Sequence, residues 1–224
     1  MSTKAVAIDG PSGAGKSTIA KTVAKKLGYI YVDTGALYRA VGLYMLDHGA
    51  DTNNPEQVIP LLNEVEVSLR FVDGEQRVFL NEQDVSQRIR ENEVSMAASN
   101  VSRIPEVRAF LFDLQRDIAK KNNIIMDGRD IGTVVLPNAD VKIFLTASPE
   151  ERARRRYEEL LQRGQQVPYE TLLEEIKQRD YNDSHREIAP LKQAEDAILV
   201  DTTGNELETS ISLLYDLIAR KLGL

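Results

Sequence analysis

Short apolar runs alternate with longer amphipathic stretches along most of this chain. The first run, residues 4–9, contains β-branched residues between polar neighbours and predicts a buried strand. From Lys16 the apolar positions follow i, i+3, i+4 spacing as far as Leu27, and Gly28 follows, which predicts a helix with a glycine cap. Further strands are predicted at residues 29–32, 124–127, 141–145 and 197–201, with a helix near residues 36–46 and helical patterns between the later strands.

Strands separated by helices predict right-handed βαβ units and a doubly wound parallel sheet. Ligands of such sheets bind at the carboxyl ends of the strands. Three polar turns follow predicted strands, at Asp9-Gly10, Asp33-Thr34-Gly35 and Asp127-Gly128-Arg129-Asp130. We therefore expect all three turns at the ligand edge of the sheet.

One stretch departs from this rhythm between the second and third core strands. Residues 65–71 and 77–80 alternate partly between apolar and polar positions and flank Asp73-Gly74, which predicts a small antiparallel hairpin. The hairpin is either a surface addition or part of an acceptor-binding subdomain, and the pattern alone favours neither.

The segment that follows the first strand fits the phosphate-binding pattern G-x-x-x-x-G-K-[ST] from Gly10 to Ser17. In this pattern the glycines let backbone N–H groups point at phosphate oxygens, and the next helix directs its positive end at the same anion. Lys16 is expected to reach the β- and γ-phosphates, and Ser17 a magnesium ion. A chance glycine-rich turn is the alternative, but the predicted strand before the loop and helix after it favour a nucleoside triphosphate site.

Composition narrows the classes of function. The 224 residues suffice for one sizeable α/β domain with an insertion, and they include no cysteine, which excludes disulfides, thiolate metal sites and cysteine nucleophiles. No run approaches the 18 apolar residues of a membrane span, and no apolar leader precedes the first strand, so we expect a cytoplasmic protein. The net charge of −7 argues against a nucleic-acid or membrane surface and requires a local cationic cluster for any anionic ligand.

Such a cluster lies in the predicted helix from Ser148 to Gly164, which contains four closely spaced arginines. Acidic residues at helical spacing would pair with them on an ordinary solvated face. Alternatively, one or two of them cover phosphate, because arginine grips phosphate in bidentate fashion. The arginines are Arg152, Arg154, Arg155 and Arg156, and the acids are Glu150, Glu151, Glu158 and Glu159.

Together with the phosphate loop, residues 33–39, 127–133 and 179–186 resemble bacterial cytidylate kinase. The order and spacing of these segments agree along nearly the whole chain, including the insertion after the second strand and Ala189-Pro190-Leu191 after the last arginine cluster.

The resemblance implies an α/β nucleoside monophosphate kinase fold, with a five-stranded parallel sheet in the order 2-3-1-4-5, flanked by helices, and a small antiparallel insertion. Residues 1–224 would form a single kinase domain, with an acceptor-binding insertion at approximately 36–103 and a lid at approximately 149–166. The implied activity is ATP-dependent phosphorylation of CMP and dCMP to CDP and dCDP, with Mg²⁺ as cofactor, and we expect a monomer.

The resemblance also assigns roles by matching position, with Thr34 standing where the family commonly has serine. ATP would be bound by Gly10, Pro11, Ser12, Gly13, Ala14, Gly15, Lys16, Ser17 and Thr18. Ser17 and, through water, Asp127 would hold magnesium, while Lys16, Arg129, Arg155 and Arg156 would act on the transferred phosphoryl group. The acceptor phosphate would be held by Thr34, Arg39, Arg129 and Arg186, the sugar by Arg179 and Asp183, and the cytosine by Ser99, Arg108 and Asp130.

Several plainer interpretations stand beside these roles. Asp130 would simply pair with Arg129, Arg108 would be an exposed helix arginine, and we expect His48 and His185 to be solvated or hydrogen-bonded surface residues. The competing enzyme is a P-loop kinase for UMP, AMP or a hydroxylated metabolite. A nucleotide-dependent switch or ATPase is the alternative from another class, and the lack of an Asn-Lys-x-Asp motif counts against a GTPase. A structural or interaction protein would leave the three polar turns unexplained.

Overall fold

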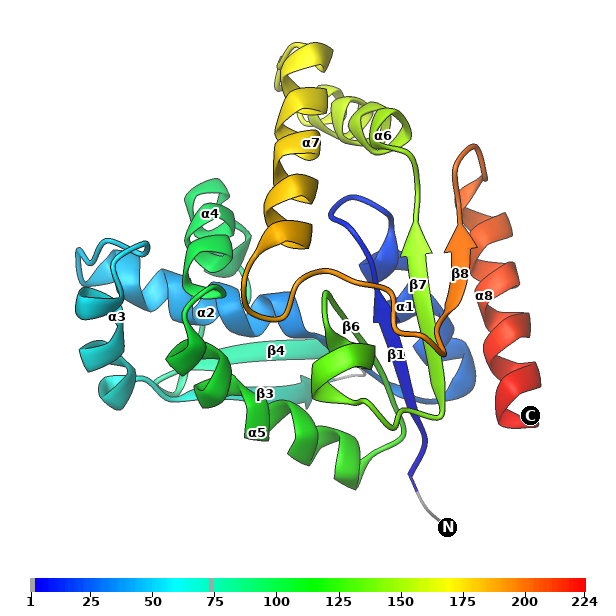
Figure 1. Ribbon diagram of the computed structural model, residues 1–224, viewed down its shortest axis with the longest axis horizontal. Helices are drawn as coiled ribbons and strands as arrows, with labels where there is room; N and C mark the ends of the chain where they lie inside the picture. Colours follow the sequence, from blue (N-terminus) through cyan, green and yellow to red (C-terminus); the bar gives the residue numbers. More distant parts are fainter. Residues whose placement is uncertain (1–2, 73–74) are drawn as a thin grey trace. The chain divides into compact units, whose positions relative to one another are not determined.

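Five strands form the larger sheet of the computed structural model, which describes residues 3–72 and 75–224 (Figure 1). Their order is β2-β6-β1-β7-β8, which confirms the predicted order 2-3-1-4-5 for the strands of this sheet. Strand β1 pairs in parallel with β6 on one side and β7 on the other, and β8 pairs in parallel with β7. Asp9 pairs in register with Gly128, so β1 and β6 place their polar turns at the same edge.

The described residues divide into two units. The larger unit comprises Lys4–Tyr29 and Ile124–Leu224, and the smaller unit comprises Ile30–Asn123 with Thr3. The elements of the larger unit are β1 (Ala5–Asp9), α1 (Lys16–Leu27), β6 (Ile124–Gly128), the π-helical turn η3 (Ile131–Val135), β7 (Val141–Thr146), α6 (Pro149–Gln162), α7 (Tyr169–His185), β8 (Ile198–Asp201) and α8 (Leu207–Leu222).

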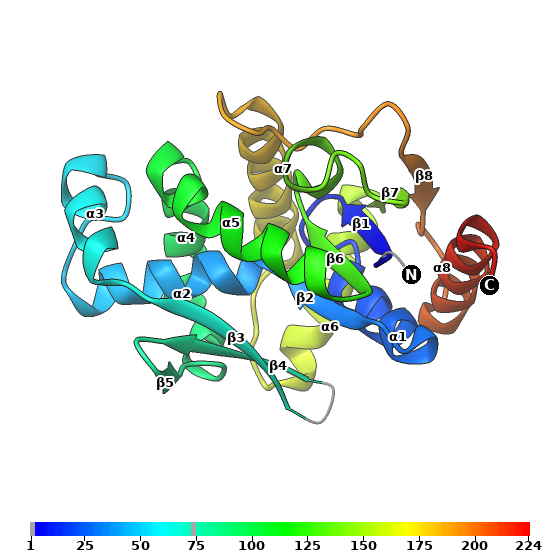
Figure 2. The same ribbon diagram turned by 90° about the horizontal axis from the view of Figure 1, so that it is seen from below.

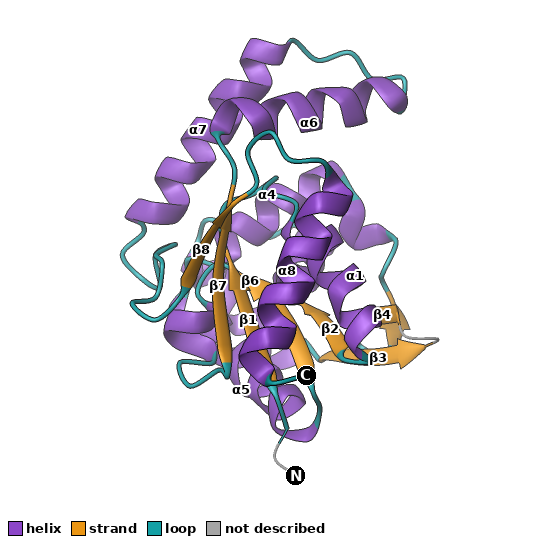
Figure 3. Ribbon diagram, turned by 90° about the vertical axis from the view of Figure 1, so that its right-hand side faces the viewer, coloured by secondary structure: helices purple, strands orange, loops and turns teal. Residues whose placement is uncertain are grey.

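In the larger unit, helices α1 and α8 lie side by side, and α8 also packs against β7 (Figure 3). Helix α1 follows its prediction closely, because Gly28 adopts φ 70° and caps it after Leu27. Helix α6 begins where Ser148 accepts a hydrogen bond from the backbone N–H of Glu151 at 3.1 Å, with Pro149 in the first turn. It starts beyond the carboxyl end of β7, and α7 packs against it (Figure 1).

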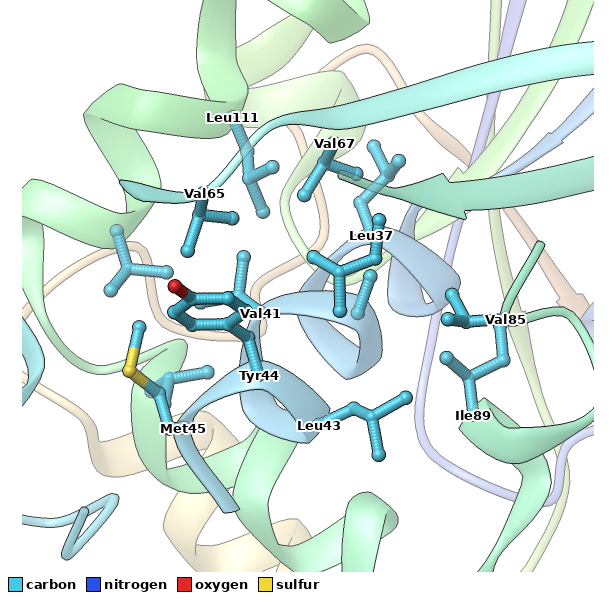
Figure 4. Packing of buried hydrophobic residues seen from close by; sticks show 14 of the residues in the cluster. Leu37, Val41, Leu43, Tyr44, Met45, Val65, Val67, Val85, Ile89 and Leu111 are labelled. Carbon is cyan, nitrogen blue, oxygen red and sulfur yellow. The ribbon is translucent and has the colours of Figure 1, made fainter. Parts of the chain in front are cut away.

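The elements of the smaller unit are β2 (Ile30–Asp33), α2 (Thr34–Asp47), α3 (Pro55–Leu61), the 3₁₀ turn η1 (Leu62–Glu64), β3 (Val67–Val72), β4 (Glu75–Leu80), β5 (Gln83–Asp84), the 3₁₀ turn η2 (Arg88–Arg90), α4 (Asn92–Val101) and α5 (Pro105–Lys121). Helix α2 supplies the middle of the core. Its buried Leu37, Val41 and Met45 pack with side chains such as Val67 from the small sheet and Leu111 from α5 (Figure 4).

The predicted hairpin is confirmed as β3 and β4, which pair antiparallel with Val67 opposite Leu80 (Figure 2). A short third strand, β5, pairs with β4 and was not expected, because two exposed polar residues carry no alternating pattern. The predicted turn at Asp73-Gly74 lies outside the described residues.

The expected turn at Asp33-Thr34-Gly35 is wrong in one respect, because α2 begins at Thr34 with no intervening loop. The carboxylate of Asp33 accepts a hydrogen bond from the backbone N–H of Ala36 at 3.1 Å and caps the helix. The side chain of Gln76 on β4 accepts from the Asp33 backbone N–H at 2.9 Å. Strand end and helix start are therefore one continuous feature.

Helices α2 and α4 approach closely at Gly42. A Cβ atom there would lie 2.9 Å from the backbone nitrogen of Ala98, which leaves room for hydrogen only. None of the helices in the described part of the chain is both long enough and apolar enough to cross a membrane.

Candidate functional site

The phosphate loop connects β1 to α1 in the larger unit. It begins at Gly10, where a Cβ atom would lie 1.9 Å from the backbone oxygen of Leu145 on β7, so only glycine fits. Gly15 precedes α1 with φ 86°, and no side chain of the described residues caps the first turn of that helix. The N–H groups of this turn are therefore suited to an anion. All predicted ATP-binding residues lie in this loop and first turn, namely Gly10, Pro11, Ser12, Gly13, Ala14, Gly15, Lys16, Ser17 and Thr18.

Lys16 lies folded back over the loop. Its Nζ donates to the backbone oxygen of Pro11 at 2.8 Å, and the residue is only 6% exposed. Burial and the nearby positive charge of Arg129 lower the pKa of Lys16 to about 7, against the attraction of Asp127 and Asp9. An anionic phosphate would supply the compensating negative charge that this ammonium group needs.

Ser17 and Asp127 provide oxygen atoms beside the loop. The Ser17 hydroxyl donates to Oδ2 of Asp127 at 2.9 Å, and Asp127 is buried at the end of β6. Magnesium prefers oxygen ligands and keeps several waters. A hydroxyl and a carboxylate in contact at the start of α1 fit a magnesium ion that is also bound by phosphates.

Asp9 is a buried charged residue that sequence reasoning placed in a turn without a role. Its two carboxylate oxygens accept from the backbone N–H groups of Ile131 and Gly132, both at 2.7 Å. Burial raises the pKa of Asp9 to about 6, although these two hydrogen bonds oppose the rise. The carboxylate joins the end of β1 to η3, directly after Arg129 and Asp130. The signal available in the sequence was an aspartate at the end of a wholly apolar strand.

Arg129 and Arg186 each contact a carboxylate of the larger unit. Nε of Arg129 donates to Oδ2 of Asp183 on α7 at 2.8 Å, and Nη2 of Arg186 lies 3.8 Å from Oδ1 of Asp130. Nε of Arg186 also donates at 2.6 Å to the backbone oxygen of Ala189, whose φ of 45° is uncommon outside glycine. The structure thus brings together four predicted acceptor residues in two arginine–carboxylate pairs.

Asp183 lies among positive charges. Burial alone would raise the pKa of its carboxyl group, but the charge and hydrogen bond of Arg129, with the charges of Arg179 and Arg186, hold that pKa below its usual value. Arg179 stands one helical turn before Asp183 on α7. The predicted sugar-binding pair therefore lies close to Arg129 and Arg186, two of the predicted phosphate-binding arginines.

The arginines of α6 separate into two kinds. Arg154 and Arg156 form ion pairs with acids one turn away, as the solvated-face interpretation expects. Arg155 donates to Glu151 at 2.9 Å and also to the backbone oxygen of Thr202 at 2.9 Å. Arg152 is 2% exposed and donates to the backbone of the phosphate loop, a contact that helical spacing could not reveal.

The smaller unit places Thr34 and Arg39 at the start of α2. Thr34 is buried, and Arg39 lies one turn later with Nη1 3.9 Å from Oδ2 of Asp33. Arg90 approaches the same carboxylate oxygen at 3.7 Å. Sequence reasoning missed Arg90, because it lies in a short 3₁₀ turn with no motif of its own.

Ser99 and Arg108 come together around Ser102. The Ser102 hydroxyl donates to the backbone oxygen of Ser99 at 2.9 Å, and Nη1 of Arg108 donates to the backbone oxygen of Ser102 at 3.4 Å. The Arg108 guanidinium also lies 5.7 Å from the ring centre of Tyr38 on α2. Arg108 is half-buried rather than a plain exposed helix arginine.

The two histidines lie at the ends of α2 and α7. Both are exposed, and each stacks on a tyrosine one turn earlier, His48 on Tyr44 and His185 on Tyr181. The expectation of hydrogen-bonded surface histidines is confirmed, because each also contacts the backbone oxygen of that tyrosine.

The family-model and sequence comparisons agree on one family. A family model described as cytidylate kinase matches residues 6–220. A protein named cytidylate kinase from Caldicellulosiruptor saccharolyticus is 52% identical over 97% of this chain and 96% of its own length. Another of that name, from an Exiguobacterium species, is 53% identical over 95% of each chain. Among solved structures, an uncharacterized protein from Eubacterium ventriosum is 16% identical over 97% of this chain and 99% of its own, with a TM-score of 0.54, and this likeness concerns the fold alone.

Proposed function

The chain belongs to the cytidylate kinase family, and we propose that it transfers the γ-phosphoryl group of ATP to CMP and dCMP, forming CDP and dCDP. The observation that supports this most directly is a buried phosphate-loop lysine, Lys16, whose pKa is lowered by burial and by the positive charge of nearby Arg129. Phosphate oxygens bound beside Lys16 would favour its charged form and add to the attraction that Asp127 and Asp9 already exert.

The donor is held by the backbone of the phosphate loop and by Lys16, in contact with the β- and γ-phosphates. Phosphoryl transfer passes through a loose transition state in which negative charge spreads over several oxygens, so catalysis depends on positioning and positive charge. Lys16, Arg129, Arg155 and Arg156 supply that charge. The attacking group is a phosphate oxygen that is already ionised near neutral pH, so no histidine is required as a base.

Ser17 and, through water, Asp127 hold the magnesium ion that accompanies ATP. When bound, magnesium neutralises charge on the β- and γ-phosphate oxygens. The Ser17–Asp127 hydrogen bond of 2.9 Å supports this assignment, because it holds both oxygen ligands at the start of α1.

Thr34, Arg39, Arg129 and Arg186 bind the acceptor phosphate. Arginine suits this task, because its planar fork donates two parallel hydrogen bonds to phosphate. Arg179 and Asp183 bind the sugar hydroxyls, with the Asp183 carboxylate kept ionised by the surrounding arginines.

Ser99, Arg108 and Asp130 select the base. Cytosine presents an amino donor at position 4, which suits a carboxylate or hydroxyl oxygen, and an acceptor at N3, which suits a guanidinium. Uracil inverts both groups and would leave buried polar atoms unpaired, at about 1 to 3 kcal/mol each. We therefore propose that CMP is preferred over UMP by about tenfold or more in kcat/KM.

Transfer to the acceptor rather than to water requires closure over the bound phosphates. The α6 segment near residues 149–166 and the hairpin-bearing insertion near residues 36–103 are the parts proposed to close. Arg155 and Arg156 belong to the first of these segments, where their guanidinium groups form ion pairs with Glu151 and Glu159.

A panel of acceptors tests the function. CMP, dCMP, UMP and AMP are each supplied with ATP and magnesium, and ADP release is followed by a coupled assay. We expect rapid release with CMP and dCMP and little without an acceptor. Equal turnover of CMP and UMP would refute the base-selecting roles, and acceptor-independent ADP release would identify an ATPase. Cytoplasmic location and a monomeric state remain predictions.

A further inference from the structure

Arg152 is the most buried charged residue of α6. It is 2% exposed, whereas its neighbour Arg154 has a side chain that is 54% exposed. A guanidinium group removed from water must have its donors satisfied, since an unpaired buried charge is costly. The partners of Arg152 therefore reveal what this residue holds.

Those partners come from three separate segments of the larger unit. Nε donates to the backbone oxygen of Ala147, the residue directly after β7, at 2.8 Å. Nη1 donates to the backbone oxygen of Ser12 in the phosphate loop at 3.1 Å. Nη1 and Nη2 also donate to the two carboxylate oxygens of Asp180 on α7, at 2.9 and 2.5 Å. One side chain thus joins a core strand, the phosphate loop and α7.

The phosphate loop is fitted closely to this side chain. A Cβ atom at Gly13, which has φ 76°, would lie 3.5 Å from Cβ of Arg152 and within 3.9 Å of its Cγ and Cδ. The loop backbone therefore packs along the aliphatic part of Arg152 while Ser12 accepts from its head. A shift of the loop at Ser12 would move or break this contact.

On the other side, Asp180 lies on α7 between two residues proposed to bind the acceptor, Arg179 and Asp183. Asp183 in turn accepts from Arg129 at 2.8 Å. A continuous series of contacts therefore runs from the backbone of the donor loop, through Arg152 and Asp180, along one turn of α7 to Asp183 and Arg129.

We propose that Arg152 and Asp180 are positioning residues that couple the donor loop to α7, so that binding of the triphosphate and binding of the nucleoside monophosphate strengthen each other. Neither residue needs to touch a substrate. The loop conformation that accepts phosphates fixes Ser12, and the guanidinium transmits that position to the helix that carries Arg179 and Asp183. Coupling of this kind is reciprocal by thermodynamic necessity. The proposal rests on the proposed function, because it needs two substrates.

The chain offers a matched control pair on the same two helices. Lys177 on α7 lies 3.4 Å from Glu150 on α6, and both side chains are more than half exposed, at 53% and 57%. This pair also links α6 to α7, but it joins two exposed side chains and does not involve the phosphate loop. An exposed pair of this type contributes little to stability. Lys177→Met therefore tests whether any ion pair between α6 and α7 is enough to couple the binding of the two substrates.

The experiment measures the affinity of the full chain for CMP by isothermal titration, with and without a non-hydrolysable ATP analogue and magnesium. The ratio of the two dissociation constants is the coupling factor. For the unsubstituted protein we expect a factor of about 5 or more. Asp180→Asn keeps the size of the side chain and one acceptor for Arg152, but removes its charge and second acceptor. We expect Asp180→Asn and Arg152→Met to bring the factor close to one.

Steady-state kinetics provides the second readout. The KM for CMP should rise about tenfold in Asp180→Asn at saturating ATP, because small displacements of binding groups are costly. The dissociation constant of the ATP analogue alone should change less than the coupling factor does. Lys177→Met should match the unsubstituted protein in both measurements.

A normal coupling factor in Asp180→Asn, or an equal loss in Lys177→Met, would overturn the proposal. Thermal denaturation shows whether Arg152→Met is folded. If it is not, the result for Asp180→Asn decides the question. If the unsubstituted protein releases no ADP with CMP, the proposed function fails. If it does so but shows no coupling, only this inference fails.

Discussion

The buried residues at the phosphate loop of the larger unit and the arginines beside Asp33 in the smaller unit are held to very different degrees. Asp9, Lys16 and Asp127 are 4%, 6% and 3% exposed, and their hydrogen bonds measure 2.7 to 2.9 Å. In the smaller unit, the side chain of Arg39 is 25% exposed and that of Arg90 is 61% exposed. Both lie 3.7 to 3.9 Å from the same carboxylate oxygen of Asp33.

The difference indicates how each group obtains its binding energy. We propose that the groups at the phosphate loop are positioned in advance for ATP, at the cost of burying Asp9 and Lys16, whose pKa values are shifted by that burial. The looser arginines must be ordered by the ligand, at a cost of about 0.5–1.5 kcal/mol for each side chain. Changes among the donor residues should therefore affect the chemical step, whereas changes in the smaller unit should affect acceptor affinity.

Lys16→Ala provides the largest expected effect. The fixed positive charge of Lys16 stabilises the negative charge that develops on the phosphate oxygens during transfer. Its removal should lower kcat by about 10³-fold, because no other group takes its place. Steady-state ADP release measures this loss. Lys25→Ala changes a lysine on the exposed side of the same helix and should retain normal kcat. A Lys16→Ala enzyme with near-normal kcat would break the comparison.

Arg39→Ala tests the acceptor side. We expect the KM for CMP to rise about 10- to 100-fold, the value of one charge-assisted contact, with a smaller change in kcat. The KM for ATP should stay unchanged. Arg88→Ala serves as the control, because Arg88 is engaged by both carboxylate oxygens of Asp47 at 2.7 and 2.9 Å. A drop in kcat alone would assign Arg39 to the chemical step instead.

The contrast also explains what the sequence could predict. The parallel sheet, the phosphate loop, α1 and α6 were predicted because each depends on local patterns, such as the apolar stripe that ends at Gly28 or the Ser148-Pro149 start of α6. The start of α2 was predicted wrongly, because Asp33 is typical of a turn. In the structure its backbone is held by hydrogen bonds to the side chain of Gln76, which lies far along the chain.

Three further residues near the candidate site, Arg152, Arg90 and Asp9, make contacts between distant segments that the sequence could not reveal. The sequence alone does not distinguish Arg152 from Arg154, because both lie among acids at helical spacing. Arg152 contacts Ser12, which lies 140 residues away in the chain, and it is this contact that separates the two. Arg90 and Asp9 were missed for the same reason, because their partners lie on other elements. The residue-by-residue ligand roles remain predictions.

The pH dependence of stability tests whether Asp9 is strained by burial. Its pKa is raised to about 6 in the folded protein from 3.8, so the folded state binds a proton more readily than the unfolded state. Between these values the contribution of Asp9 to stability grows as pH falls. The unfolding free energy of the unsubstituted protein should therefore gain about 2 kcal/mol over that of Asp9→Asn between pH 7 and pH 4.5.

Urea denaturation at several pH values measures this gain. Asp117→Asn is the control, because the Asp117 carboxyl is exposed and its pKa is lowered by Lys120. The difference in unfolding free energy between the unsubstituted protein and Asp117→Asn should not increase as pH falls. A flat difference for Asp9→Asn would mean that two backbone hydrogen bonds fully offset the burial of its charge.

The smallest expected effect is a proton count. With a pKa of about 7, Lys16 is mostly neutral at pH 8. Phosphate beside it restores the charged form, so binding of ATP and magnesium at pH 8 should take up close to one proton, since phosphate itself, with a pKa near 6, is already ionised. Calorimetric titrations in buffers of different ionisation enthalpy measure the uptake. Lys16→Arg keeps a charge that does not titrate and should show none. If the unsubstituted protein also takes up no proton, Lys16 is already charged before ATP binds. Holding its ammonium group at the phosphate loop then costs no more free energy than holding the more exposed arginines of the smaller unit.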